Sequence, residues 1–266
     1  MDRYKLVIRG EQPLNGETYV SGGKNTSLAV IPATLLCEEP CVIENLPDIE
    51  DVRVLHRILL ELGAKVDFNT AEKRMVIDPR SVKSATVPFQ YSQMMRASYY
   101  FMGALLGRYG TADVGYPGGC DIGSRPIDQH IKGFSALGSE ISEYNGMMCL
   151  KGNLAGTIIN FDMVTVGATI NVMLAAVRAK GNTVLTNAAR EPHVVDLANF
   201  LNSMGAKIRG AGTDTIRIRG AERLHGRTYT VIPDQIETGT LMIAAAATRG
   251  QVTLRGCIPT HMEALT

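Results

Sequence analysis

One short string occurs three times in this chain and limits the folds that the chain can adopt. A leucine or methionine is followed by a glycine, a small residue, a charged residue and a β-branched residue at 62–66, 137–141 and 204–208. Each copy ends a segment with apolar residues at helical spacing, and its glycine suits the left-handed conformation that closes a helix. A strand-like run follows. These three matched corners favour an internal repeat over a generic alternation of helices and strands.

The whole repeat is predicted to read helix, strand, helix, strands. The first helices are expected at 27–36, 92–106 and 169–179, the strands after them at 42–46, 112–115 and 184–186, and the second helices at 52–62, 127–137 and 194–204. Because the first helices are apolar on nearly every side, we expect them to fill the interior, with the sheets and second helices outside. Residues 23–232 are therefore predicted to form one α/β (α+β) lobe of three repeats.

A fourth copy of the repeat begins near the C-terminus. Residues 237–246 match a first helix, 252–256 match its strand, and 261–265 match the start of the second helix at 193–197. The glycine that would close this helix is expected beyond Thr266. We therefore expect residues 1–22 and 233–266 to form an incomplete second lobe, whose apolar surface favours self-association.

Composition excludes several classes of function. The chain has 266 residues, 45% of them hydrophobic, and a formal net charge of +1, so no nucleic acid or membrane partner is expected from bulk charge. The longest apolar run, 241–247, is too short to span a membrane, and the charged N-terminus does not resemble a signal peptide, which predicts a cytoplasmic protein. Five cysteines without a Cys-x-x-Cys pair argue against a disulfide framework and a metal site, and no cofactor is predicted.

The segment 116–128 carries the residues best suited to chemistry. Its glycines allow positive φ and close approach to a ligand, and it holds Cys120, Asp121 and Arg125. A helix beginning near Pro126 would add free N–H groups to the charge of Arg125, which attracts phosphate or carboxylate and makes a neighbouring thiol more acidic. Cys120 is therefore expected to be the most reactive cysteine. The alternative is a glycine- and proline-rich surface turn whose cysteine has no role.

Six motifs, in order along the chain, resemble the UDP-N-acetylglucosamine (UDP-GlcNAc) 1-carboxyvinyltransferases, a family of enoylpyruvyl transferases. They are Ser-Gly-Gly-Lys-Asn at 21–25, Met-Met-Arg-Ala-Ser at 94–98, the segment 117–126, Val-Gly-Ala-Thr at 166–169, Ala-Ala-Arg-Glu-Pro at 188–192 and Ile-Pro-Asp-Gln-Ile-Glu-Thr-Gly at 232–239. The sister enzyme that uses shikimate 3-phosphate shares the fold, but its Gly-Asn-Ala/Gly-Gly-Thr segment is absent here. The resemblance implies an inside-out α/β barrel lobe of three units, the start of a second such lobe, and an active site in the cleft between lobes.

The resemblance also implies a reaction. The enolpyruvyl group of phosphoenolpyruvate would pass to the 3′-hydroxyl of UDP-GlcNAc by addition and elimination, with release of phosphate, in the first committed step of peptidoglycan synthesis. Lys24, Arg96 and Arg125 would bind the phosphate and carboxylate of phosphoenolpyruvate, and Asn25 would bind the sugar. Cys120 would protonate C3 of the enolpyruvate and react with fosfomycin. Cys120, Lys24 and Arg125 are thus the catalytic candidates.

UDP-GlcNAc is expected to contact two further segments of the chain. The resemblance assigns the uridine to Arg125, Pro126, Ile127 and Asp128, and the diphosphate to Thr165, Val166 and Gly167. The latter three would open a helix, whose first N–H groups can bind an anion without any side chain. Met163 stands where many relatives carry a lysine, and His130 is expected to be a supporting helix residue.

Two other functions stay open. By resemblance, the general-base aspartate and further phosphoenolpyruvate-binding arginines lie in the second lobe, beyond Thr266, so this chain alone is expected to have little or no turnover. One alternative is therefore a catalytically inactive remnant that binds UDP-GlcNAc. The other is an unrelated ligand-binding or assembly protein on the same fold.

Overall fold

The computed structural model describes residues 5, 7–10, 12–116, 118 and 126–266. The chain forms two compact units. The large unit is Gly23–Ile232, and the small unit combines Met1–Gly22 with Pro233–Thr266. Across the described ranges, each helix is either too short or too polar to cross a lipid bilayer.

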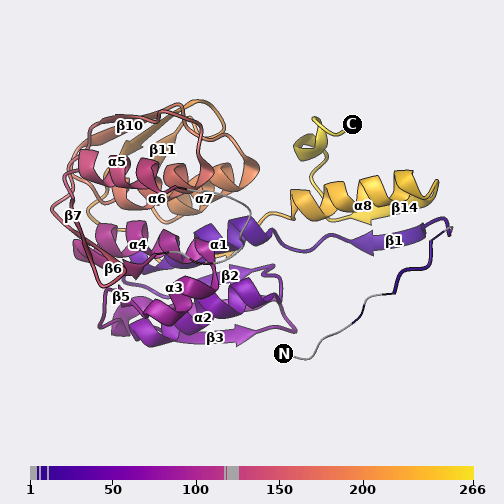
Figure 1. The fold of residues 1–266 in the computed structure, drawn as a ribbon, viewed down its shortest axis with the longest axis horizontal. Coiled ribbons are helices and arrows are strands. Elements are labelled where there is room, and N and C mark those ends of the chain that lie inside the picture. Colours follow the sequence, from indigo (N-terminus) through magenta and orange to yellow (C-terminus); the bar gives the residue numbers. More distant parts are fainter. Residues whose placement is uncertain (1–4, 6, 11, 117, 119–125) are drawn as a thin grey trace. The chain divides into compact units, whose positions relative to one another are not determined.

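Three apolar helices form the interior of the large unit. They are α1 (Lys24–Ala33), α4 (Tyr100–Tyr109) and α6 (Val166–Ala176), and every residue from Ala168 to Ala176 is buried. Figure 1 shows these helices in the middle of the large unit, with β2 and β3 on one side and β10 and β11 on the other. The prediction that the first helices fill the interior is confirmed.

Three four-stranded sheets of identical order surround these helices. The first holds β13 (Thr228–Thr230), β2 (Cys41–Glu44), β4 (Arg74–Asp78) and β3 (Lys65–Asn69), the second β5 (Thr86–Val87), β6 (Thr111–Gly115), β8 (Met147–Lys151) and β7 (Glu140–Tyr144), and the third β9 (Ile158–Asn160), β10 (Asn182–Thr186), β12 (Thr215–Arg219) and β11 (Lys207–Arg209). In each sheet the first strand named runs parallel to the second, and the other pairings are antiparallel.

The second helix of each repeat ends at the predicted glycine corner. These helices are α2 (Glu50–Leu62), α5 (Asp128–Ala136) and α7 (Pro192–Ser203). Gly63, Gly138 and Gly205 follow them with φ of 96°, 93° and 108°, which only glycine adopts without strain. A strand starts two residues later each time, so the corners predicted from the sequence are confirmed.

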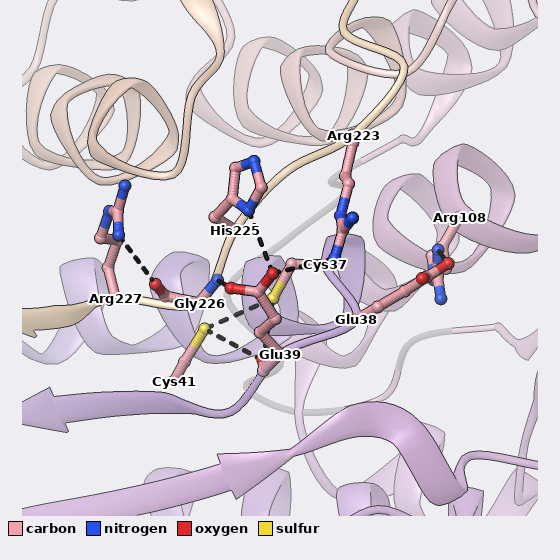
Figure 2. A network of polar contacts seen from close by, with 9 residues as sticks. All are labelled: Cys37, Glu38, Glu39, Cys41, Arg108, Arg223, His225, Gly226 and Arg227. Carbon is pink, nitrogen blue, oxygen red and sulfur yellow. Dashed lines mark hydrogen bonds and ion pairs between the residues drawn. The ribbon is translucent and has the colours of Figure 1, made fainter.

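The last strand of the large unit closes the set of three sheets into a ring. β13 follows the third repeat, yet it pairs with β2 of the first repeat. Figure 2 shows the polar contacts beside this junction, where Glu39 accepts hydrogen bonds from Arg223 (3.1 Å) and the Gly226 N–H (3.2 Å). The Nδ1 atom of His225 lies 3.0 Å from the same carboxylate. Residues almost two hundred positions apart are therefore joined by a strand pairing and by charge.

The helix predicted over 92–106 is broken, which corrects the sequence prediction. The segment forms α3 (Phe89–Met94), the 3₁₀ turn η3 (Arg96–Tyr99) and then α4. Met95 between them is buried and extended, with φ −153° and ψ 141°. The hydroxyl of Ser98 donates to Met95 O at 2.8 Å and stabilises the break. As a result, Arg96 opens the 3₁₀ turn instead of lying inside a helix.

The small unit contains α8 (Gln235–Ala247) and a pair of parallel strands, β1 (Asn15–Tyr19) and β14 (Gln251–Arg255). Asp234 caps α8 by accepting hydrogen bonds from the N–H groups of Ile236 and Glu237. The helix predicted at 261–265 is instead the 3₁₀ turn η4 (Pro259–Met262), because a helical segment this short is not stable by itself. Two further 3₁₀ turns, η1 (Thr34–Leu36) and η2 (Pro79–Ser81), lie in the large unit.

The close packing of α4 on α6 gives a direct test of this fold. A Cβ atom added at Gly103 would lie 2.1 Å from the backbone oxygen of Asn171. We expect Gly103→Ala to lower the free energy of unfolding by about 1–3 kcal/mol, measured by urea denaturation. Gly107→Ala is the matched control on the same helix. A Cβ atom added there would lie 3.0 Å from Leu174 O, so this variant should lose less free energy of unfolding. Equal stability of the two variants would contradict this packing.

Candidate functional site

The first turn of α6 is the centre of the candidate site. Thr165 caps the helix, accepting from the Ala168 N–H at 3.5 Å, and the Thr169 hydroxyl donates to Thr165 O at 2.7 Å. Val166 and Gly167 follow the cap and are half-buried. The N–H groups at the start of a helix have no partner inside it and lie at its positive end. This turn can therefore bind an anion through its backbone.

Two side chains lie directly against this turn. A Cβ atom added at Gly167 would lie 2.5 Å from the Tyr99 hydroxyl and 3.0 Å from Nε2 of His130. Position 167 therefore needs glycine to let η3 and α5 approach α6. The rings of Tyr99 and His130 also contact each other edge to face, with centroids 4.6 Å apart.

A buried amide fixes the orientation of both rings. Asn171 has no exposed surface, and its Nδ2 donates to Tyr99 O at 2.8 Å and lies 3.1 Å from Nδ1 of His130. Its Oδ1 accepts from the Gly103 N–H at 2.8 Å. Because the amide nitrogen can only donate, Nδ1 of His130 is the acceptor and the imidazole proton sits on Nε2. Asn171 therefore connects α4, η3 and α5 to α6.

His130 is neutral at physiological pH. Burial is the main cause that lowers the pKa of His130, and the positive charge of Arg96 lowers it further, to about 3. Asp128 acts in the opposite direction and only partly offsets these effects. A neutral ring adds no positive charge to the site, so the cations of the site must come from elsewhere.

Arg96 brings an incompletely satisfied guanidinium to the same place. Its Cζ atom lies 5.3 Å from the centroid of the Tyr99 ring, in a cation–π contact. Its Nε atom is buried and has no hydrogen-bond partner among the described residues. A buried donor without a partner is costly, and an anion bound beside Arg96 would satisfy it.

The sequence-predicted site residues lie in different parts of the chain. Gly167 approaches Tyr99 and His130, Arg96 lies over the Tyr99 ring, and Thr165 and Val166 directly precede Gly167 in the chain. Asp128 opens α5 two residues before His130, with Gln129 donating to its carboxylate at 3.0 Å. Pro126 is exposed and Ile127 is half-buried at the start of α5. Lys24 and Asn25 open α1, where Lys24 pairs with Asp51 at 2.6 Å. Cys120 and Arg125 lie outside the described residues.

Motif reasoning missed Tyr99 and Asn171, and it gave His130 only a supporting role. A signal for Asn171 was present, because an amide inside the apolar helix 166–176 must find partners when buried. Met163, where many relatives were expected to carry lysine, is 59% exposed and supplies no charge at this position. In the part of the chain that the structure describes, no group of three or more His, Cys, Asp or Glu side chains could hold a metal ion.

The ring of three repeats around buried helices is shared with solved enolpyruvyl transferases. The crystal structure of the enolpyruvyl transferase NikO from Streptomyces tendae matches with a TM-score of 0.77 and 27% sequence identity, over 88% of this chain and 56% of that chain. The chain belongs to the EPSP synthase (3-phosphoshikimate 1-carboxyvinyltransferase) family, whose model matches residues 8–266. The fold class predicted from the repeats is confirmed.

Curated relatives refine the comparison within this family. The chain is 55% identical over 262 residues to UDP-N-acetylglucosamine 1-carboxyvinyltransferase 3 of Caldanaerobacter subterraneus subsp. tengcongensis, and 51% identical over 263 residues to UDP-N-acetylglucosamine 1-carboxyvinyltransferase 2 of Bacillus cereus. These matches cover 98% of this chain but only 62% and 61% of the two relatives. The resemblance found in the motifs is therefore confirmed, and the chain spans about three fifths of the length of these relatives.

The depressed pKa of His130 predicts a specific dependence of stability on pH. An unfolded histidine binds its proton near pH 6.5, whereas folded His130 binds it near pH 3. Its neutral form therefore stabilises the fold fully above pH 6.5, and this contribution is lost as the pH falls toward 3, with a slope of up to about 1.4 kcal/mol per pH unit. In urea denaturation between pH 7 and 5, we expect His130→Gln to have a shallower slope than the unsubstituted protein. His225→Gln, whose ring faces the Glu39 carboxylate and not the first turn of α6, is the control, and parallel slopes for all three proteins would contradict the assignment.

Proposed function

We propose that this chain serves the transfer of the enolpyruvyl group of phosphoenolpyruvate to the 3′-hydroxyl of UDP-GlcNAc, in peptidoglycan synthesis in the cytoplasm. The observation that carries the proposal is the buried Nε of Arg96, which lacks a partner among the described residues beside the anion-binding turn of α6. An anionic substrate supplies the partner that this arrangement needs. The names of the curated relatives support the choice of substrates.

The nucleotide end of the substrate is assigned to α5 and α6. The diphosphate would accept hydrogen bonds from the first turn of α6, at Thr165, Val166 and Gly167. The uridine would lie against Arg125, Pro126, Ile127 and Asp128. Asp128 supports this assignment because its carboxylate is exposed and lies at the start of α5, two residues before His130.

The phosphoenolpyruvate end is assigned to Lys24, Arg96 and Arg125 as cations, with Asn25 on the sugar and Cys120 as the acid that protonates C3. Guanidinium groups suit carboxylate and phosphate because they can form two parallel hydrogen bonds. Three of the other four cysteines are less suited to this role by burial, although the hydrogen bond with Cys41 lowers the pKa of Cys37. Cys37 and Cys41 are buried, and burial raises the pKa of the half-buried Cys149 thiol.

A second candidate function is binding of UDP-GlcNAc without transfer. The pairing of β13 with β2 favours it, because the large unit closes its own ring of sheets and holds every described residue assigned to the nucleotide. Phosphate release with both substrates separates the two functions. Release that disappears in Cys120→Ala supports transfer, binding without release, which is the result expected for residues 1–266 alone, supports the second function, and the absence of both contradicts both.

We also propose self-association through α8. The interior helices of the large unit bury most of their residues, whereas α8 buries only Thr238 and Gly239 and exposes more than half of Ile236 and of Ile243. Such an apolar helix face favours contact with another copy. Light scattering over a concentration series should show a rising mass. A constant monomer mass at high concentration would contradict this proposal.

The uridine assignment predicts the effect of one exposed carboxylate. Asp128→Ala should weaken UDP-GlcNAc binding roughly tenfold, the loss expected for one charge-assisted hydrogen bond, measured by isothermal titration calorimetry. Asp162→Ala is a closely matched control, since Gln129 Nε2 donates to both carboxylates, at 3.0 Å to Asp128 and 3.1 Å to Asp162. Equal losses in the two variants would show that the effect comes from Gln129 and not from the nucleotide.

A further inference from the structure

The outer face of the third sheet differs in charge from the same face of the other two sheets. In each repeat, a strand starts two residues after the glycine that follows the second helix. The first residue of this strand lies opposite a residue of the neighbouring antiparallel strand. This pair is Lys65 and Asp78 in the first sheet and Glu140 and Lys151 in the second, so opposite charges face each other. In the third sheet it is Lys207 and Arg219, which carry the same charge.

The next outward pair strengthens the difference. In the third sheet Arg209 lies opposite Arg217, whereas the equivalent pairs are Asp67 with Val76 and Ser142 with Cys149. Lys207, Arg209, Arg217 and Arg219 are all exposed. Within the described ranges, none of these four side chains forms an ion pair with a carboxylate.

The outward residues of the other two strands of this sheet, all of them described, carry no charge to balance the four cations. On β10 the outward residues are Asn182, Val184 and Thr186, and on β9 they are Ile158 and Asn160. Like charges directly opposite each other in a sheet are destabilising, since their Cβ atoms lie about 4.5–5.5 Å apart. The first two repeats fold on the same plan without this cost, so folding does not require the cluster.

The four cations surround one hollow. An open hollow of about 790 Å³ is lined by Lys207, Arg209, Arg217 and Arg219, together with Asn182 and Asn202. The backbone of Ile208 holds the side-chain amide of Asn202. Nδ2 of Asn202 donates to Ile208 O at 3.0 Å, and Oδ1 of Asn202 accepts from the Ile208 N–H at 2.8 Å. This volume is in the range of small-ligand sites, and the compact grouping differs from the extended stripe that fits a nucleic-acid duplex.

We propose that this face of the third sheet, formed by β10, β11 and β12, is a second binding site, for a compact anion with several phosphate groups. Three guanidiniums can each bind phosphate oxygens in pairs, and the lysine adds a point charge. An inorganic polyphosphate and the phosphate chain of a nucleotide share this chemistry. The site lies on an outer sheet and not on the first turn of α6, so it is independent of the proposed transfer reaction.

Calorimetry with inorganic tripolyphosphate at low salt tests the site. We expect Arg217→Gln/Arg219→Gln to weaken binding at least tenfold, and affinity for the unsubstituted protein to fall as salt screens the charges. Lys151→Gln, at the position equivalent to Arg219 in the second sheet, should change the affinity less than about twofold, a difference of roughly 0.4 kcal/mol. Unchanged UDP-GlcNAc binding by the double variant would show that the variant is folded and that the two sites are separate.

Further calorimetry experiments identify the source of the phosphate groups and the site at which they bind. ATP binding at least as tightly as tripolyphosphate supports a nucleotide source, and tenfold weaker ATP binding supports an inorganic source. Tripolyphosphate binding lost in Arg96→Gln but kept in the double variant would place the anion at α6 and overturn the proposal. Tighter binding of a short DNA duplex than of tripolyphosphate, or no tripolyphosphate binding at all, would also overturn it.

A thermal test does not depend on loss of binding alone. Arg219→Asp recreates in the third sheet the Lys–Asp pair of the first, so the ligand-free melting temperature should rise by about 1–4 °C. The same change should abolish the rise in melting temperature that tripolyphosphate gives the unsubstituted protein. A variant that is still stabilised equally by tripolyphosphate would overturn the proposal.

Discussion

The side-chain amide of Asn171 is the interaction on which both the interior and the candidate site depend. It is buried in the middle of an apolar helix, where an unpaired amide would be costly. Its oxygen accepts from Gly103 of α4, and its nitrogen serves Tyr99 O and His130 Nδ1. Because all three contacts are made at once, the packing of the core helices determines where the two rings lie against the first turn of α6.

The threefold repeat separates what is needed for folding from what is specific to one copy. Each repeat supplies a buried helix, a strand, a second helix that ends at a glycine, and an antiparallel pair of strands. The close approach at Gly167 belongs to the third repeat, as do the four outward cations of its sheet. These features occur in one repeat only, and the backbone shared by all three repeats does not require them. We therefore assign binding to them.

Much of the fold could be predicted from the sequence, because its signals are local. Gly63, Gly138 and Gly205 mark helix ends through their positive φ, and apolar spacing marks the buried helices. The break at Met95 could not be predicted, since 92–106 has a continuous helical pattern and the break depends on the bonds of Ser98. The short turn at 259–262 was mistaken for a helix because it matched a longer helix elsewhere in the chain.

The site was predictable only in part. Arg96 and Thr165–Gly167 are marked by motifs, and in the structure Arg96 and Gly167 both lie beside Tyr99. Tyr99 and Asn171 were missed because their roles depend on contacts between residues 72 positions apart in the chain. The cation pairs of the third sheet were missed for a related reason, since strand register decides which charges face each other.

We expect the first turn of α6 to bind the diphosphate of UDP-GlcNAc through its backbone N–H groups. Amide-resolved NMR tests this binding most directly, with UDP-GlcNAc and uridine titrated separately into the protein. We predict that UDP-GlcNAc shifts the amide resonances of Val166, Gly167 and Ala168 more than those of the rest of α6, and that uridine leaves these three unchanged. UDP-GlcNAc binding that leaves these three amides unperturbed would contradict the account.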